Sequence, residues 1–109
     1  MVRVVVAAFG LALAWGSASM AEEVRPSFDC AKATTFVEKE ICRSPKLATL
    51  DRQLARLYRD LFPKDGEYGK IYKEMREEQR TWVAARNECQ TLACLEQHYR
   101  ERIEELSPP

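Results

Sequence analysis

The sequence predicts a small all-α protein, stapled by disulfides and built on a long antiparallel helix hairpin with a short helix before it and another helix after it. Apolar residues recur at steps of three and four over long stretches. Helix-capping residues precede several of these stretches. Gly and Pro number only 4 and 5 in 109 residues, whereas all-β chains need many turn residues. The length allows one small domain.

Residues 1–21 have the features of a secretory signal peptide. Arg3 precedes an apolar run over residues 4–15, and small residues precede a cleavage site near Ala21-Glu22. The run is shorter than the about 20 apolar residues that cross a bilayer, and no Cys sits at the cleavage site to carry a lipid. We therefore expect a periplasmic or secreted protein with no membrane span and no lipid anchor.

All four cysteines lie in residues 22–109, which we expect to form a single domain with its core at about 27–106. An even number of cysteines in a small exported chain indicates a disulfide framework. Three connectivities are open, and we favour the nearest-neighbour pairs Cys30–Cys42 and Cys89–Cys94, which close two short loops. A zinc site is the alternative. The chain has no C-x2-C pair and its one histidine is His98, so we expect no metal and no cofactor.

Helix-start signals define the first two helices after an extended lead-in over residues 22–29. Thr35 and Glu38 fit a capping box for a helix at 36–43. Ser44 is a good N-cap, and the proline after it suits the first helical position of a helix that ends before the turn at 63–66. This second helix carries an apolar stripe made of Leu47, Leu50, Leu54, Leu57, Tyr58 and Leu61.

The third helix is predicted from about Glu67 to Asn87 and pairs with the second across a short connection. Gln79 and Arg86 interrupt its apolar seam, and a buried Gln or Arg needs polar partners. The fourth helix follows Thr91, which is its candidate N-cap. We expect the core to contain Leu54, Leu57, Tyr58, Met75, Trp82, Tyr99 and Ile103.

The sequence does not point to an enzyme. It has no nucleophile, phosphate-loop or metalloprotease motif, and a structural or surface role is the better interpretation of His98. A formal net charge of zero argues against nucleic-acid binding. Arg52, Arg56 and Arg59 lie close together on the second helix. We interpret them as part of an ordinary mixed-charge surface that Asp51, Asp60 and the acidic residues of 74–78 neutralise.

Four short motifs follow one another along the chain: Ser27-Phe28-Asp29-Cys30 with Ile41-Cys42; Leu50-Asp51 with Leu54 and Tyr58; Gln79-Arg80-x-Trp82 with Arg86-Asn87-x-Cys89; and Cys94-Leu95 with Tyr99 and Arg102-Ile103. In this order they resemble the LprI family of lysozyme inhibitors over about 27–106. The resemblance implies an exported helical domain with two local disulfides. It also implies structural roles for Asp29, Asp51, Tyr58, Gln79, Trp82, Arg86, Tyr99 and Arg102, with Asp51 and Arg86 in a buried or half-buried polar network.

The resemblance further implies a protein partner, a lysozyme, that is inhibited by binding and occlusion. The alternative is a structural or interaction module of the bacterial envelope with no hydrolase target. The turn between the second and third helices is the most obvious protrusion, and its candidate contacts are Lys64, Asp65, Glu67 and Tyr68. A plain helix-hairpin turn is the other interpretation of this segment. The sequence leaves the oligomeric state open.

Overall fold

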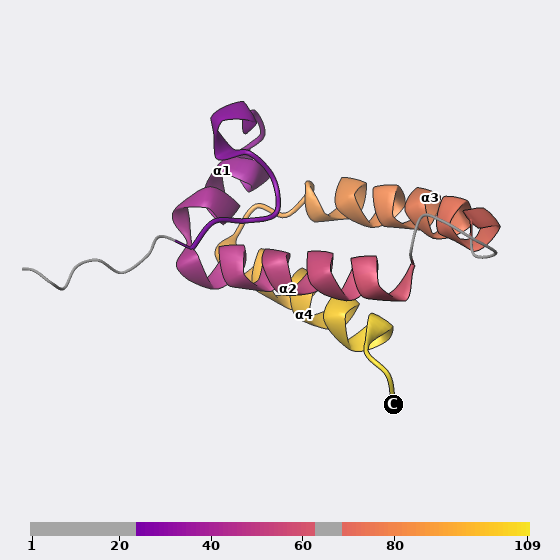
Figure 1. The fold of residues 1–109 in the computed structure, drawn as a ribbon. Coiled ribbons are helices and arrows are strands. Elements are labelled where there is room, and N and C mark those ends of the chain that lie inside the picture. Colours follow the sequence, from indigo (N-terminus) through magenta and orange to yellow (C-terminus); the bar gives the residue numbers. More distant parts are fainter. Residues whose placement is uncertain (1–23, 63–68) are drawn as a thin grey trace, which may run out of the picture.

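The computed structural model describes residues 24–62 and 69–109, and this part of the chain is helical (Figure 1). A 3-10 turn, η2 (Cys30–Lys32), precedes four α-helices: α1 (Phe36–Arg43), α2 (Pro45–Leu61), α3 (Gly69–Arg86) and α4 (Leu92–Leu106). No strand occurs within the described residues. The predicted all-α fold class is confirmed.

Side-chain caps set the helix starts that the sequence predicts. The Thr35 hydroxyl accepts the Glu38 N–H, and the Glu38 carboxylate accepts the Thr35 N–H, which completes the capping box of α1. The Ser44 hydroxyl accepts the Leu47 N–H at the start of α2, and Pro45 occupies the first helical position. The Thr91 hydroxyl accepts the Cys94 N–H at the start of α4. Each cap gives a partner to a backbone N–H that the helix itself leaves free.

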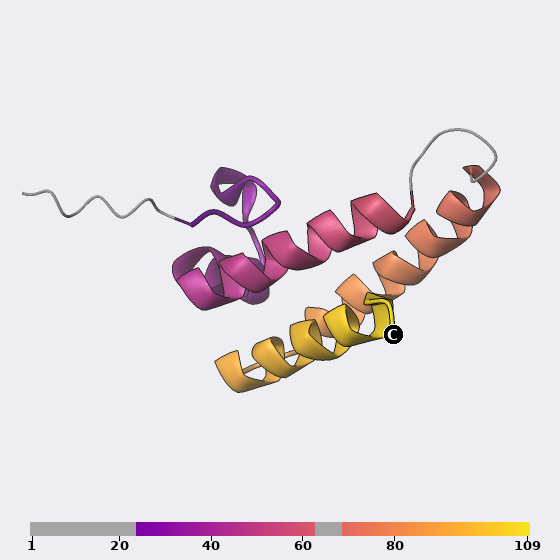
Figure 2. The same cartoon turned by 60° about the horizontal axis from the view of Figure 1, so that its bottom comes forward.

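The close helix pairing differs from the expected one. Helix α2 packs most extensively against α4 and then against α1, and the antiparallel neighbour α3 makes less contact with it. Figures 1 and 2 show α2 and α4 side by side, while the start of α3 extends beyond the ends of both helices. The apolar stripe of α3 is interrupted by polar residues, and its Ile71 remains 46 % exposed. Less apolar area is therefore available to hold α3 against α2.

The core lies where α1, α2 and α4 meet. Leu54 and Tyr99 belong to it as predicted, at 3 % and 0 % exposure, and Trp82 and Ile103 pack against it while partly buried. The other expected core residues, on α2 and α3, are only half-buried and lie outside the cluster: Leu57, Tyr58 and Met75. The stripe on α2 identified the buried face correctly, but the packing with α4 moves the centre of the core toward the start of α2. The buried cluster contains Val37, Ile41, Leu47, Leu50, Leu54, Cys89, Leu95 and Tyr99.

Within residues 24–62 and 69–109, none of the helices is both long and apolar enough to cross a membrane. The signal-peptide prediction for residues 1–21 falls outside the described part of the chain.

Candidate functional site

Two local disulfides lie at the same end of the helical core, one just before the start of α2 and one at the start of α4. Cys30 is bonded to Cys42 with the Cα atoms 6.0 Å apart, so η2 is tied to the last turn of α1. Cys89 is bonded to Cys94 with the Cα atoms 5.6 Å apart, which clamps the corner between α3 and α4. The favoured connectivity is confirmed. No cysteine is free, so none is available as a thiolate nucleophile or metal ligand.

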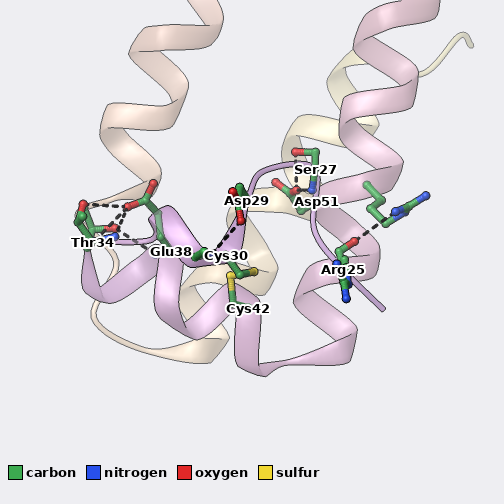
Figure 3. Close-up of a disulfide and its surroundings, with 11 residues drawn as sticks. Arg25, Ser27, Asp29, Cys30, Thr34, Glu38, Cys42 and Asp51 are labelled. Atoms are coloured by element: carbon green, nitrogen blue, oxygen red, sulfur yellow. Dashed lines mark hydrogen bonds between the residues drawn. A yellow bond between two sulfur atoms is a disulfide. The ribbon is translucent and has the colours of Figure 1, made fainter. Parts of the chain in front are cut away.

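Asp51 is the centre of a buried polar network, and Figure 3 shows its contact with Ser27. Its Oδ2 accepts hydrogen bonds from the backbone N–H and the hydroxyl of Ser27, both at 2.6 Å. Its Oδ1 accepts the Tyr99 hydroxyl at 2.7 Å. The carboxylate is only 6 % exposed, and a buried charge of this kind is tolerated when hydrogen bonds replace water. Asp51 therefore joins the N-terminal segment, α2 and α4.

Arg86 completes this network from the end of α3. Its Nη1 donates to the Tyr99 hydroxyl oxygen at 3.0 Å, and its Nε and Nη2 donate to Asn87 Oδ1 at 3.1 and 2.9 Å. Asp51 and Arg86 do not form a direct ion pair, because the Tyr99 hydroxyl lies between them. Burial raises the pKa of Tyr99, and the negative charge of Asp51 raises it further. The phenol thus stays protonated and links the two buried charges.

A second polar contact joins α3 to α4. Arg102 is only 3 % exposed. Its Nε donates to Gln79 Oε1 at 3.1 Å, and its Nη1 donates to Glu78 and Glu105 at 3.0 and 3.1 Å. Gln79, which interrupts the apolar seam of α3, thus has the polar partner that its position requires.

Aromatic rings fill the space between these two polar contacts. Trp82 meets Tyr99 edge-on with ring centroids 5.1 Å apart and stacks on His98 at 5.2 Å. The Arg86 guanidinium lies over the Trp82 ring, 6.0 Å from its centroid. His98 is thus a partly buried member of an aromatic stack.

The two remaining motif residues have less demanding surroundings. Asp29 caps η2, since its Oδ1 accepts the Ala31 N–H at 2.9 Å. Tyr58 is half-buried beside α3, and burial raises the pKa of its phenol. Among the described residues, its hydroxyl has no hydrogen-bond partner. Asp29 therefore acts locally, and Tyr58 contributes mainly its ring.

The arginines of α2 have fewer acidic partners than the sequence predicts. Asp51 is buried and engaged by Ser27 and Tyr99, so it does not offset the exposed charges of Arg52, Arg56 and Arg59. None of these three arginines belongs to an ion pair within residues 24–62 and 69–109. Two of the expected partners on α3 are engaged elsewhere, because Glu77 pairs with Arg80 and Glu78 with Arg102.

The candidate contacts Lys64, Asp65, Glu67 and Tyr68 lie outside the described residues. The sequence also provides no direct signal for the bond from Ser27 to Asp51, which joins residues 24 positions apart. Such a contact depends on how the N-terminal segment folds back over α2, and no helical period encodes it.

The fold and its contacts define a class: a four-cysteine, all-α module held by two local disulfides and a buried Asp–Tyr–Arg network. A family model described as "Lysozyme inhibitor LprI" matches residues 30–106, which is more than half of the chain. The chain belongs to the LprI family. Comparison with curated proteins and with solved structures gave no match. The two disulfides and the family together indicate an extracytoplasmic location.

Proposed function

We propose that this protein is an exported inhibitor of lysozyme-type cell-wall hydrolases that acts by binding and occlusion, with no chemistry of its own. The observation that carries the proposal is the family match over residues 30–106. The sequence features of residues 1–21 support export with cleavage near Ala21-Glu22 into the periplasm or the medium.

The disulfides suit an occluding surface. Association is penalised by the ordering of side chains and loops at the interface. One disulfide ties η2 to α1, the other clamps the corner between α3 and α4, and the buried cluster holds α2 against α1 and α4 before the partner arrives. The protein therefore presents a preformed surface. The contacts at 63–68 remain a prediction of the sequence.

A lysis assay tests the proposal. The full gene is expressed in bacteria, the processed protein is purified in its oxidised form, and it is titrated into several types of lysozyme acting on bacterial cell walls. We expect saturable, stoichiometric loss of lysis. The same protein, reduced and alkylated, should no longer inhibit lysis because its two disulfides are broken. Full lysis by every lysozyme at micromolar excess of the oxidised protein would contradict the proposal.

One observation favours the alternative of an envelope interaction module. Phe36 is 54 % exposed and lines a shallow groove with residues 87–90, and Leu92 nearby in sequence is 51 % exposed. Exposed apolar side chains of this size suit a standing partner. This alternative would be supported if the protein inhibited no lysozyme but sedimented with cell envelopes, and if substitution of Phe36 abolished that sedimentation.

A further inference from the structure

One side of α2 carries three exposed arginines that form no ion pair within the described residues. Arg52, Arg56 and Arg59 are exposed and spaced by four and three residues, so they share one face of the helix. Arg25 joins them from the N-terminal segment, because Arg52 Nη1 donates to the Arg25 carbonyl oxygen at 3.5 Å. We call these four residues the arginine face.

Three other surface arginines each pair with an acidic neighbour. Arg43 pairs with Glu40, Arg80 with Glu77 and Arg100 with Glu96, all at 2.9–3.1 Å. No ion pair in the described part of the chain includes a residue of the arginine face. Its one acidic neighbour on the exposed side of α2 is Asp60. The face therefore keeps a net positive charge on a protein whose total charge is zero.

The spacing of these charges fits a pair of carboxylates. Residues four apart on a helix have Cβ atoms about 5–6 Å apart. The two carboxyl groups in a glycosidase cleft are about 5–5.5 Å apart in retaining enzymes and about 6.5–9.5 Å apart in inverting ones. A guanidinium also binds a carboxylate through two parallel hydrogen bonds, which a lysine cannot do. Two adjacent arginines on a rigid helix can thus engage two adjacent acids.

The structure supports α2 as the presenting element. Its opposite side is held by the core cluster, with Leu47, Leu50 and Leu54 all buried. Asp51 anchors the N-terminal segment beside Arg52, which places Arg25 next to the helix. The arginines therefore extend from a backbone that is already ordered, so binding orders only their side chains.

We propose that Arg52 and Arg56 bind the pair of catalytic carboxylates in the cleft of a lysozyme-type glycosidase, with Arg25 and Arg59 at the rim of the contact. This inference rests on the proposed function and names the surface that performs it. The hydrolase then loses both the acid that protonates the glycosidic oxygen and the carboxylate that stabilises or attacks the sugar. Inhibition is competitive with the cell-wall polysaccharide.

Charge reversal tests the surface. The variant Arg52→Glu/Arg56→Glu should raise the concentration needed for half-inhibition by about 100-fold or more, because it replaces two charge-assisted contacts with repulsion. The variant Arg52→Lys/Arg56→Lys keeps the charge but loses the paired hydrogen bonds. Its concentration for half-inhibition should therefore lie between those of the wild type and the charge-reversal variant. Circular dichroism checks that each variant is folded.

A matched control exists on α3. Arg76 and Arg80 are also exposed and four residues apart, and Arg76→Glu/Arg80→Glu makes the same change in net charge. The concentration of this control that gives half-inhibition should stay within about threefold of the wild-type value, since distant exposed charges are screened by salt. Loss of binding by a hydrolase whose two cleft acids are changed to amides, measured by calorimetry, would support the same contact from the other side.

The outcomes separate the inference from the proposed function. A wild-type protein that inhibits, together with an equally potent Arg52→Glu/Arg56→Glu variant, would overturn the arginine face and leave the function standing. A loss confined to Lys64→Ala/Tyr68→Ala would do the same and assign the contact to the turn. The inference would also be overturned if Arg52→Glu/Arg56→Glu abolished binding to anionic lipid vesicles but left inhibition unchanged. The arginine face would then be a membrane-binding surface. A wild type that inhibits no lysozyme overturns both.

Discussion

At the scale of single residues, the fold depends on how a few buried polar groups are paired. Asp51 and Arg86 are each 6 % exposed, and they meet through the hydroxyl of Tyr99. Buried charges add little net stability by themselves, but removing a partner leaves the other charge unsatisfied at high cost. The Tyr99 hydroxyl therefore hydrogen-bonds to both buried charged groups.

The Tyr99→Phe variant tests this pairing. It keeps the ring that meets Trp82 but removes the hydroxyl between Asp51 and Arg86, so we expect a loss of about 1–3 kcal/mol in the free energy of unfolding. Urea denaturation followed by circular dichroism measures it.

Tyr58→Phe is the matched control, because the Tyr58 hydroxyl has no hydrogen-bond partner among the described residues. This change should be neutral or slightly stabilising, since no bond is lost. Equal effects of the two substitutions would contradict the account of the network.

Part of this network is predictable from the sequence. The positions of Gln79 and Arg86 in an apolar seam predict that both need partners, and both have them. Their partners are not predictable in the same way. Ser27 and Tyr99 lie 24 and 48 positions from Asp51, and contacts at this separation depend on the packing of whole helices.

At the scale of the secondary-structure elements, the caps explain where three helices begin. In the capping box of α1, backbone N–H groups of Thr35 and Thr34 donate to Glu38 and hold its pKa below the ordinary value near 4.5. A lowered pKa in the folded state means that the contribution of Glu38 is present above the unfolded pKa and is lost as the pH falls through the folded one.

The Glu38→Ala variant should therefore be less stable than the wild type at pH 7, by about 0.3–1 kcal/mol, because a charge at a helix N-terminus is lost. The gap should close below about pH 4 as the wild-type carboxylate takes up its proton. Urea unfolding at several pH values measures both stabilities. The neighbouring exposed change Lys39→Ala serves as control, and a gap for Glu38→Ala that grew toward low pH would refute the assignment.

Helix α3 is held to α4 mainly by its second half, where Trp82 packs and Arg102 reaches back to Glu78 and Gln79. Arg102→Ala should cost about 2–3 kcal/mol, because it removes several charge-assisted hydrogen bonds from a buried side chain. Hydrogen exchange of the α3 amides should also be faster in this variant than in the wild type. Arg100→Ala, which removes an exposed pair on the same helix, should cost under about 1 kcal/mol. Similar costs for both would show that α3 is held by other means.

The helix ranges follow closely from the sequence, but their packing does not. Capping residues predict the starts of α1, α2 and α4 because each cap is a local contact within four residues. The apolar stripe of α2 shows which face is buried without saying which helix buries it. A short connection favours α3 as the partner, whereas the more apolar surface of α4 and α1 takes that place.

At the scale of the whole molecule, two disulfides support a small core. A bridge over a short loop contributes about 2–3 kcal/mol by restricting the unfolded chain. The two bridges differ in their surroundings, because Cys89 belongs to the buried cluster while Cys30 is exposed. We expect Cys89→Ser/Cys94→Ser to lower the thermal midpoint more than Cys30→Ser/Cys42→Ser, since it also places a hydroxyl in the core. The reverse order in calorimetry would contradict this view of the core.

The central claim is that this LprI-family chain blocks the cleft of a lysozyme-type hydrolase. The most direct measurement is calorimetric titration of the purified protein into a lysozyme that it inhibits, with and without a chito-oligosaccharide bound in the cleft. We predict one-to-one binding that weakens in proportion to the occupancy of the cleft by the sugar. Binding of unchanged affinity in the presence of saturating oligosaccharide would contradict occlusion.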